Sequence, residues 1–282
     1  MQVVSISSLK GGVGKTSVTL GLASAALAAG IPTLVVDLDP HADATTGLGV
    51  SLGAGKQLGI GEMLRTARRA ELSDNVVPSG WVANARRLRK GTVGRKPVLD
   101  VAMGSAYSGI YDRPDLSRRD VRRLTTLLSR VTGYGLVLID CPPSLNGLTR
   151  MAWTASNRVM LVAEPALFSV AGTERTMRAL ELFRAEFAPN LGPARIIANR
   201  VRATSNEHAF RLAEMKQMFG DLVLTPTIAE QANWQQIQGA AHSVHHWPGE
   251  SAKQSAATFD ALLKNLTDSG GVRNRVARRP VA

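Results

Sequence analysis

Cysteine, acidic residues and long apolar runs are the scarce features of this sequence. Its 282 residues include one cysteine, Cys141, which excludes an intramolecular disulfide framework. No histidine lies near Cys141 in the sequence, so we expect a small core residue rather than a nucleophile. No run approaches the roughly 20 apolar residues that a membrane span needs. The first residues also lack the pattern of a signal peptide, so we expect a protein of the reducing cytoplasm.

Acidic residues are too few to balance the basic ones. The chain has 34 Lys and Arg against 22 Asp and Glu, a net charge of +12, and a pI near 10.6. No acid lies between positions 75 and 99. Solvated surface charge is the simplest interpretation of such clusters, and non-specific contact with nucleic-acid phosphates is the alternative. The clusters are Arg86, Arg87, Arg89, Lys90, Arg95 and Lys96; then Arg118, Arg119, Arg122 and Arg123; then Arg273, Arg275, Arg278 and Arg279.

A glycine-rich loop follows the first apolar segment. Residues 3–7 read as a buried strand, and residues 17–29 read as a helix that ends before Gly30 and Pro32. Between them lies Lys10-Gly11-Gly12-Val13-Gly14-Lys15-Thr16. Strand, glycine loop and helix are the order of a phosphate loop, in which Lys15 reaches the β/γ-phosphates of ATP and Thr16 binds Mg²⁺. Lys10 is a second lysine beside the phosphates, which suggests a second role.

Three aspartates follow apolar strands. Asp37 and Asp39 end the segment 32–39, where alternation would place them on one face, and Asp140 ends the segment 135–140. Ligands of an open parallel sheet lie at the carboxyl ends of its strands. With the phosphate loop, these acids predict a Mg²⁺-dependent nucleotide site, with Asp140 as the metal-side acid.

Residues Lys10–Thr16, Asp37–Pro40 and Asp140–Pro143 together resemble the ParA/MinD family of deviant Walker-A P-loop ATPases, and the Soj-like ParA partition branch in particular. The resemblance implies that Lys10 reaches a partner's phosphates in an ATP-sandwich homodimer. It further implies that Asp39 positions the attacking water and that Asp37 supports Mg²⁺ with Thr16 and Asp140. His41 stands where the family commonly has glutamine, which we expect to leave the chemistry unchanged. The implied nucleotide contacts are Lys10, Gly11, Gly12, Val13, Gly14, Lys15, Thr16, Ser17, Asn199 and Pro226.

Alternating patterns predict an α/β fold with a mainly parallel sheet and helices on both faces. We expect one ATPase domain over residues 1–267, with a basic insertion at 75–97 and a disordered basic tail at 268–282. Strands are predicted at 2–8, 32–38, 98–102, 134–140, 157–163, 194–199 and 222–225. Helices are predicted at 15–29, 58–70, 117–132, 145–155, 171–187, 205–219 and 251–267.

Two further groups of residues have open interpretations. DNA contacts are expected at Arg86, Arg87, Arg89 and Lys90, with Arg200 and Arg202 as secondary candidates, because the turn at 230–233 lacks the arginines that DNA-binding members often carry. His242, His245 and His246 could bind zinc, but surface packing is the better interpretation because few other ligands lie nearby.

The expected function is an ATP-dependent partition ATPase. It would hydrolyse ATP slowly with Mg²⁺, bind DNA non-specifically on the nucleoid, and be released by a centromere-binding ParB-like adaptor. The alternative is a MinD-like membrane-associated ATPase, but the segment 272–282 lacks the bulky apolar residues of a membrane-binding helix. An iron–sulfur relative such as the nitrogenase iron protein would need more than one cysteine. We also expect no N-terminal helix-turn-helix, because the first strand starts at once.

Overall fold

The structure is a computed structural model that describes residues 1–8, 10–51, 56–83 and 97–268. Arg86, Arg87, Arg89 and Lys90 lie outside the described residues. So does the predicted basic tail 268–282 except for Asp268, which ends a helix instead. Among the described helices, none combines the length and the apolar character needed to cross a membrane.

A seven-stranded sheet forms the centre of the described chain, in the order β3-β4-β2-β5-β1-β6-β7. All neighbouring pairs are parallel except β3 and β4, which confirms the predicted fold class. The central strands are buried throughout because helices cover both faces of a parallel sheet. The strands are β1 Gln2–Ser7, β2 Thr33–Asp37, β3 Val77–Pro78, β4 Leu99–Ala102, β5 Leu136–Asp140, β6 Arg158–Ala163 and β7 Arg195–Ala198.

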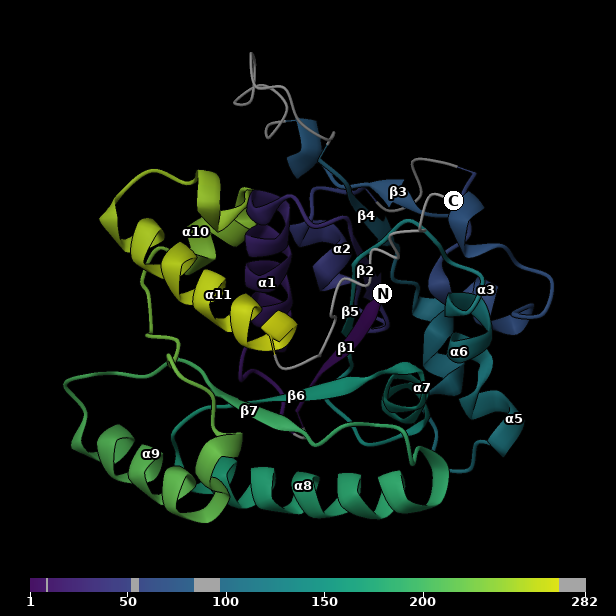
Figure 1. The fold of residues 1–282 in the computed structure, drawn as a ribbon. Helices are drawn as coiled ribbons and strands as arrows, with labels where there is room; N and C mark the ends of the chain where they lie inside the picture. The colour runs from purple at the N-terminus through teal and green to yellow at the C-terminus, as the bar shows by residue number, and fades with distance from the viewer. Residues whose placement is uncertain (9, 52–55, 84–96, 269–282) are drawn as a thin grey trace, which may run out of the picture.

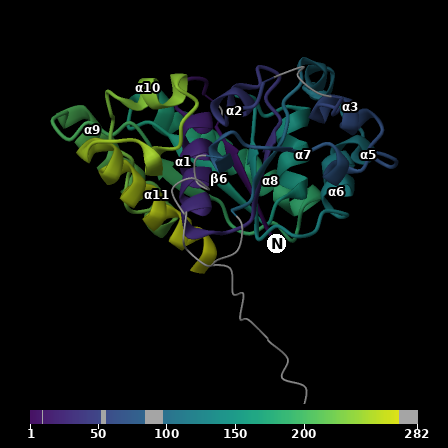
Figure 2. The ribbon, with the colours of Figure 1, turned by 90° about the horizontal axis from the view of Figure 1, so that it is seen from above.

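Helices cover both faces of the sheet (Figures 1 and 2). On one face, α1 packs against α11, and α10 lies beside them. The other face carries α3, α5, α6 and α7 around β2 and β5, and α8 and α9 beneath β6 and β7. The helices are α1 Lys15–Ala29, α2 Asp43–Gly47, α3 Ile60–Arg65, α5 Arg118–Val121, α6 Arg123–Leu128, α7 Gly147–Ala155, α8 Leu167–Phe187, α9 Asn206–Phe219, α10 Trp234–Gly239 and α11 Glu250–Asp268.

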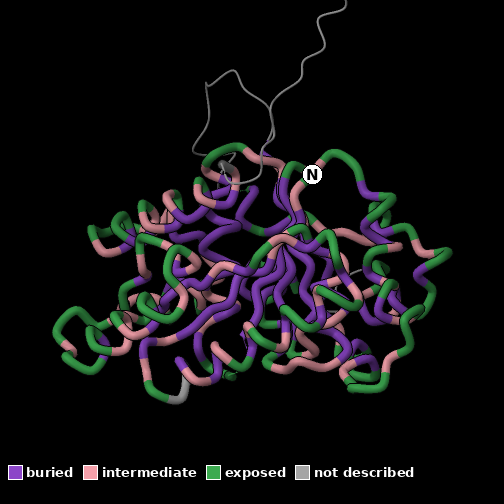
Figure 3. The backbone as a smooth tube through the Cα atoms, turned by 60° about the horizontal axis from the view of Figure 1, so that its bottom comes forward, coloured by how far each residue is buried: buried purple, intermediate pink, exposed green. Residues whose placement is uncertain are grey.

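The strand alternation divides the core between these two layers. Val4 and Leu138 pack with α1 and α11, whereas Val3 and Ile139 pack with α6 and α7. Successive side chains of a strand point to opposite faces, so one apolar run contributes side chains to the core on both faces of the sheet. Figure 3 shows the buried strands at the centre, with exposed connections around them.

Three predicted elements differ from the structure. The strand expected at 222–225 is a 3₁₀ turn, Gly220–Leu222, followed by a single bridge from Val223 to Ile196. The helix expected at 58–70 ends at Arg65 and continues only as turns. The helix expected at 117–132 breaks at Arg122 into α5 and α6 because Val121 packs with Trp153 while Leu124 packs in the neighbouring cluster.

The described start of the predicted insertion belongs to the fold. Val77 and Pro78 form the antiparallel edge strand β3. Trp81 is 2% exposed, and its indole N–H donates to the carbonyl of Ala241 at 2.8 Å. The predicted irregular insertion therefore does not begin at residue 75, because the edge strand β3 and the buried Trp81 attach residues 77–82 to the fold.

Candidate phosphate-binding site

The glycine loop connects the central strand β1 to the N-terminus of α1. Gly12 and Gly14 have φ angles of 76° and 90°, which L side chains rarely adopt. A Cβ on Gly14 would lie 2.4 Å from the side-chain nitrogen of Asn199. Glycine is thus required both for the turn and for the close approach of Asn199. The backbone N–H groups at the start of a 15-residue helix form an anion-binding end.

Asp140 connects β5 to the start of α1. Its carboxylate accepts hydrogen bonds from Thr16 Oγ1 at 2.8 Å and Thr19 Oγ1 at 2.7 Å. Burial raises the pKa of Asp140, while the bonds from Thr19 and Thr16 and the charge of Lys15 oppose that rise. Thr19 was not predicted, although it lies one helical turn after Lys15 and so shares its face.

Asp37 lies beside Asp140, because the two are register partners on β2 and β5. Its Oδ2 accepts bonds from the backbone N and the Oγ1 of Thr45, both at 2.7 Å. Its Oδ1 is buried and has no hydrogen-bond partner among the described residues. Burial and then the charge of Asp140 raise the pKa of Asp37.

The carboxylate pair fits a divalent cation. A buried oxygen without a partner is costly unless a ligand or water satisfies it. Carboxylate and hydroxyl oxygens are the ligands that Mg²⁺ prefers, and Thr16 sits between the phosphate loop and Asp140. Asp37, Asp140 and Thr16 are therefore the residues that would hold Mg²⁺.

Asp39 occupies a bend after β2 rather than the strand itself. Its side chain is 13% exposed, and its Oδ1 accepts from the backbone N of His41 at 3.1 Å and bonds His41 Nδ1 at 2.9 Å. The predicted common strand face of Asp37 and Asp39 is wrong, because the strand ends at Asp37. The histidine that we expected to be neutral for the chemistry contacts this carboxylate directly.

Lys10 is exposed, and it forms no ion pair with any residue that the structure describes. Its backbone is held by Ser8: the Ser8 hydroxyl bonds the Lys10 carbonyl at 2.9 Å and the Lys10 N–H at 3.1 Å. Lys15, by contrast, is only 7% exposed. The two lysines of the loop therefore have different surroundings, one facing outward and one facing the acids.

A pocket of about 530 Å³ adjoins the phosphate loop. Asn199 lines it and donates to the Val13 carbonyl at 2.8 Å, while Gln238 donates to Ser17 Oγ at 2.8 Å. Pro226, which we predicted to close over adenine, is not among the described lining residues. The lining comes instead from the segment 228–235 and from α10 and α11. Gln238 was missed because nothing in its local sequence marks it.

The other candidate residues have structural contacts. His245 bonds Ser24 Oγ at 2.7 Å and Asp260 at 3.0 Å, which ties the turn Val244–His246 to α1 and α11. No group of three or more His, Cys, Asp or Glu side chains placed to hold a metal occurs in the described residues, so nothing supports zinc at the histidines. Cys141 is fully buried, and burial raises the pKa of its thiol to about 12, which makes it unreactive.

The sequence and fold match one family. The model of the CobQ/CobB/MinD/ParA nucleotide binding domain matches residues 4–240. The chain belongs to this family. The match confirms the family that the sequence resemblance indicated, and the matched range contains the phosphate loop, Asp37 and Asp140.

Individual proteins resemble this chain in sequence or in fold. The chromosome partitioning protein ParA of Caulobacter vibrioides is 32% identical over 235 residues, which cover 81% of this chain and 80% of that protein. A putative plasmid partition protein from Borrelia burgdorferi, solved with AMPPNP, has a TM-score of 0.73 at 20% identity, covering 94% of this chain and 99% of that one. Cobyrinic acid a,c-diamide synthase of Mycobacterium smegmatis, with ADP and magnesium, also has a TM-score of 0.73, at 19% identity with 95% and 96% covered.

Proposed function

We propose that this protein is a ParA-type partition ATPase that hydrolyses ATP slowly with Mg²⁺. The observation that carries the proposal is the buried pair Asp37 and Asp140 beside Thr16, with one carboxylate oxygen unsatisfied, at the N-terminus of α1. We take residues 1–267 as the ATPase domain. The relationship to a chromosome partitioning protein favours partition over the other activities of the family.

The residues of the site divide the work of hydrolysis. The N–H groups of residues 11–16 and the Lys15 ammonium bind and orient the phosphates. When bound, Mg²⁺ would neutralise charge that develops on the phosphate oxygens. Asp39, which is partly exposed near the two buried acids, positions the attacking water. The site has positioning groups but no strong base, so we propose that turnover is slow until a partner stimulates it.

We further propose that two protomers sandwich ATP, bind DNA without sequence preference on the nucleoid, and separate after hydrolysis stimulated by a ParB-like adaptor. Lys10, exposed and unpaired among the described residues, is free to reach a second protomer. Doubling a weak basic surface by dimerisation would let ATP control DNA affinity.

One experiment tests the proposal as a whole: ATP turnover with and without Mg²⁺, together with DNA binding in ATP and in ADP. Mg²⁺-dependent turnover and ATP-favoured DNA binding are the expected results. Absent DNA binding together with ATP-dependent binding to anionic liposomes would replace the partition proposal with the MinD-like alternative.

Lys10→Ala should retain ATP binding but lose ATP-dependent dimerisation. The lysine would act on the partner's phosphates, so its removal leaves the protomer's own site intact. Analytical ultracentrifugation of both proteins in ATP and in ADP measures this, with Lys56→Ala as a control for loss of one exposed lysine. Normal dimerisation of the Lys10 variant in ATP would show that this lysine acts only within its own protomer.

ATP turnover should rise with pH through the titration of His41. The hydrogen bond with Asp39, and then the charges of Asp39 and Asp43, raise the pKa of this exposed ring above its usual value of 6.5. Below this pKa, the charged imidazolium keeps the Asp39 carboxylate bonded to itself and away from the attacking water. Above this pKa, the neutral ring binds the carboxylate more weakly. His41→Gln should remove that rise while leaving ATP affinity unchanged. Parallel pH profiles of kcat in the two proteins would show that the contact does not restrain Asp39.

A further inference from the structure

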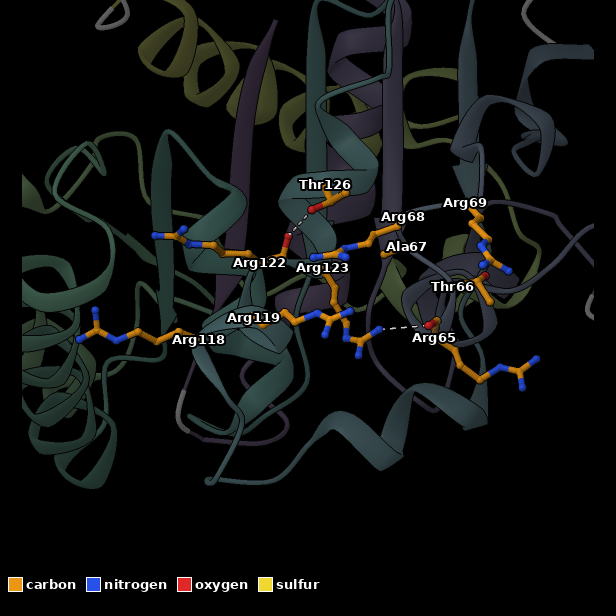
Figure 4. Close-up of a pocket in the computed structure, with 10 residues that line it drawn as sticks. All are labelled: Arg65, Thr66, Ala67, Arg68, Arg69, Arg118, Arg119, Arg122, Arg123 and Thr126. Atoms are coloured by element: carbon orange, nitrogen blue, oxygen red, sulfur yellow. Dashed lines mark hydrogen bonds between the residues drawn. The ribbon is translucent and has the colours of Figure 1, made fainter.

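Seven arginines gather around one hollow of about 870 Å³ on the side of the sheet covered by α3, α5 and α6 (Figure 4). One group comes from the end of α3 and the turns after it: Arg65, Arg68 and Arg69. The other comes from α5 and the start of α6: Arg118, Arg119, Arg122 and Arg123. The described lining also contains two threonines and an alanine, but no carboxylate. The fold therefore concentrates positive charge from two distant segments at one place.

Two arginines build this hollow rather than merely line its surface. Arg123 Nη1 donates to the carbonyls of Leu64 at 2.9 Å and Arg65 at 3.1 Å, and its guanidinium pairs with Asp120 at 2.7 Å. Arg130, beside the hollow, donates to the carbonyls of Ala67, Arg68 and Ala70. These bonds tie the turns after α3 to α6, so the two arginine groups are held at a fixed separation.

Five other arginines of the hollow form no ion pair with the described residues, and one of them, Arg65, lies 6.0 Å from the ring centroid of Tyr107. Arg68, Arg69, Arg119 and Arg122 are exposed, and none forms an ion pair within the part of the chain that the structure describes. Like charges held close together repel one another and destabilise a fold unless an anion neutralises them. By comparison, Arg202 of the predicted DNA candidates pairs with Glu230 at 2.7 Å, and Arg200 lines the pocket beside the phosphate loop.

The extent of the basic surface indicates the kind of anion. A smaller hollow continues it past Arg118 and Arg122 toward Thr154 on α7 and toward Phe187 on α8, and its lining includes Glu186, the partner of Arg118. Guanidinium groups bind phosphate through paired N–H donors. Two of the seven arginines are paired, Arg118 with Glu186 at 3.4 Å and Arg123 with Asp120 at 2.7 Å. The other five cations on one surface exceed what one small phosphate ester would neutralise, and they suit a polymer with regularly spaced charges. We infer that this arginine hollow binds the phosphate backbone of double-stranded DNA.

This inference rests on the proposed function, since it names the surface by which the proposed ATPase would hold DNA. It places that surface on α3, α5 and α6, and not on residues 86–90 or on Arg200 and Arg202. Contact would be insensitive to base sequence, because the surface offers charges to phosphates and is not an element shaped to enter a groove.

The test neutralises four of the arginines without ion pairs and leaves Arg123 and Arg130, which hold the local structure. The hollow variant is Arg68→Ala, Arg69→Ala, Arg119→Ala and Arg122→Ala. The matched control removes four exposed cations elsewhere, Arg175→Ala, Arg178→Ala, Lys253→Ala and Lys264→Ala, so both variants lower the net charge of +12 by four. Binding of a 60-base-pair duplex in ATP is measured across a salt series, and ATP affinity confirms that each variant folds.

Because each of the four arginines would neutralise one DNA phosphate, the log–log salt slope of the hollow variant should flatten by roughly 3 to 4 units, and affinity at about 0.1 M salt should fall at least tenfold. The control should keep a slope within about one unit of the wild type. A hollow variant that binds like the wild type overturns the inference while leaving the proposed function intact. If only a variant of Arg86, Arg87, Arg89 and Lys90 loses DNA affinity and the hollow variant does not, the inference is also overturned and the proposed function stands.

Wild-type protein that binds ATP but no duplex overturns both the proposed DNA function and this surface. Inorganic triphosphate is the probe for a small-anion site. If it binds the wild type tightly and the hollow variant weakly, while duplex binding is equal in both, the hollow is a small-anion site and the inference is wrong.

Discussion

Lys15→Ala is expected to remove ATP binding at micromolar nucleotide. Truncating one partner of a close charge pair costs about 2–5 kcal/mol, a loss of roughly 30- to 5,000-fold in affinity. Lys15 is nearly buried and its charge opposes the raised pKa of Asp140, so the variant also leaves that acid less stabilised as a carboxylate. Isothermal titration calorimetry with ATP and Mg²⁺ measures the loss.

Lys15→Arg is the matched control, because it keeps the charge but not the shape of the ammonium group. Thermal unfolding of each variant without nucleotide separates lost binding from lost structure. Unchanged ATP affinity in a folded Lys15→Ala protein would show that the glycine loop is not part of the nucleotide site.

Asp39→Ala should bind ATP with nearly wild-type affinity and lower turnover by at least about 100-fold, because misplacing a reacting group costs that much. Asp39 bonds His41 rather than Thr16, Thr19 or Thr45, which hold the two buried acids. Its loss should therefore spare the phosphate and metal-side groups. Single-turnover hydrolysis and ATP titration measure the two effects separately.

The comparison with Asp37→Asn sharpens this prediction. Asp37 accepts both bonds from Thr45 and has the unpartnered buried oxygen, so its variant should weaken Mg²⁺-dependent ATP binding as well as turnover. An Asp39→Ala protein that hydrolyses ATP at the wild-type rate would reject the assignment of Asp39 to the water.

Several residues of the candidate site could be picked out from short segments of the sequence. Gly12, Gly14, Lys15 and Thr16 follow from a local pattern, because positive φ angles and a helix N-terminus depend on adjacent residues only. The strand before the loop, β1, could also be predicted from its own residues. The contact predicted for Pro226 does not follow from this pocket, whose described lining lacks that residue, because packing across the sheet edge decides which turn covers a pocket.

Sequence alone determined that this chain is an α/β protein with a phosphate loop, strand-end acids and excess positive charge, since periodicity, glycine content and charge are local properties. Only the tertiary structure decided that Asp37 and Asp140 are neighbours, because strand order places β2 beside β5. It likewise brought Thr19 to Asp140, His41 to Asp39, and the arginines after α3 to those of α5 and α6. The physical reason is that whole elements move together to bury apolar surface, and that burial fixes which distant side chains meet.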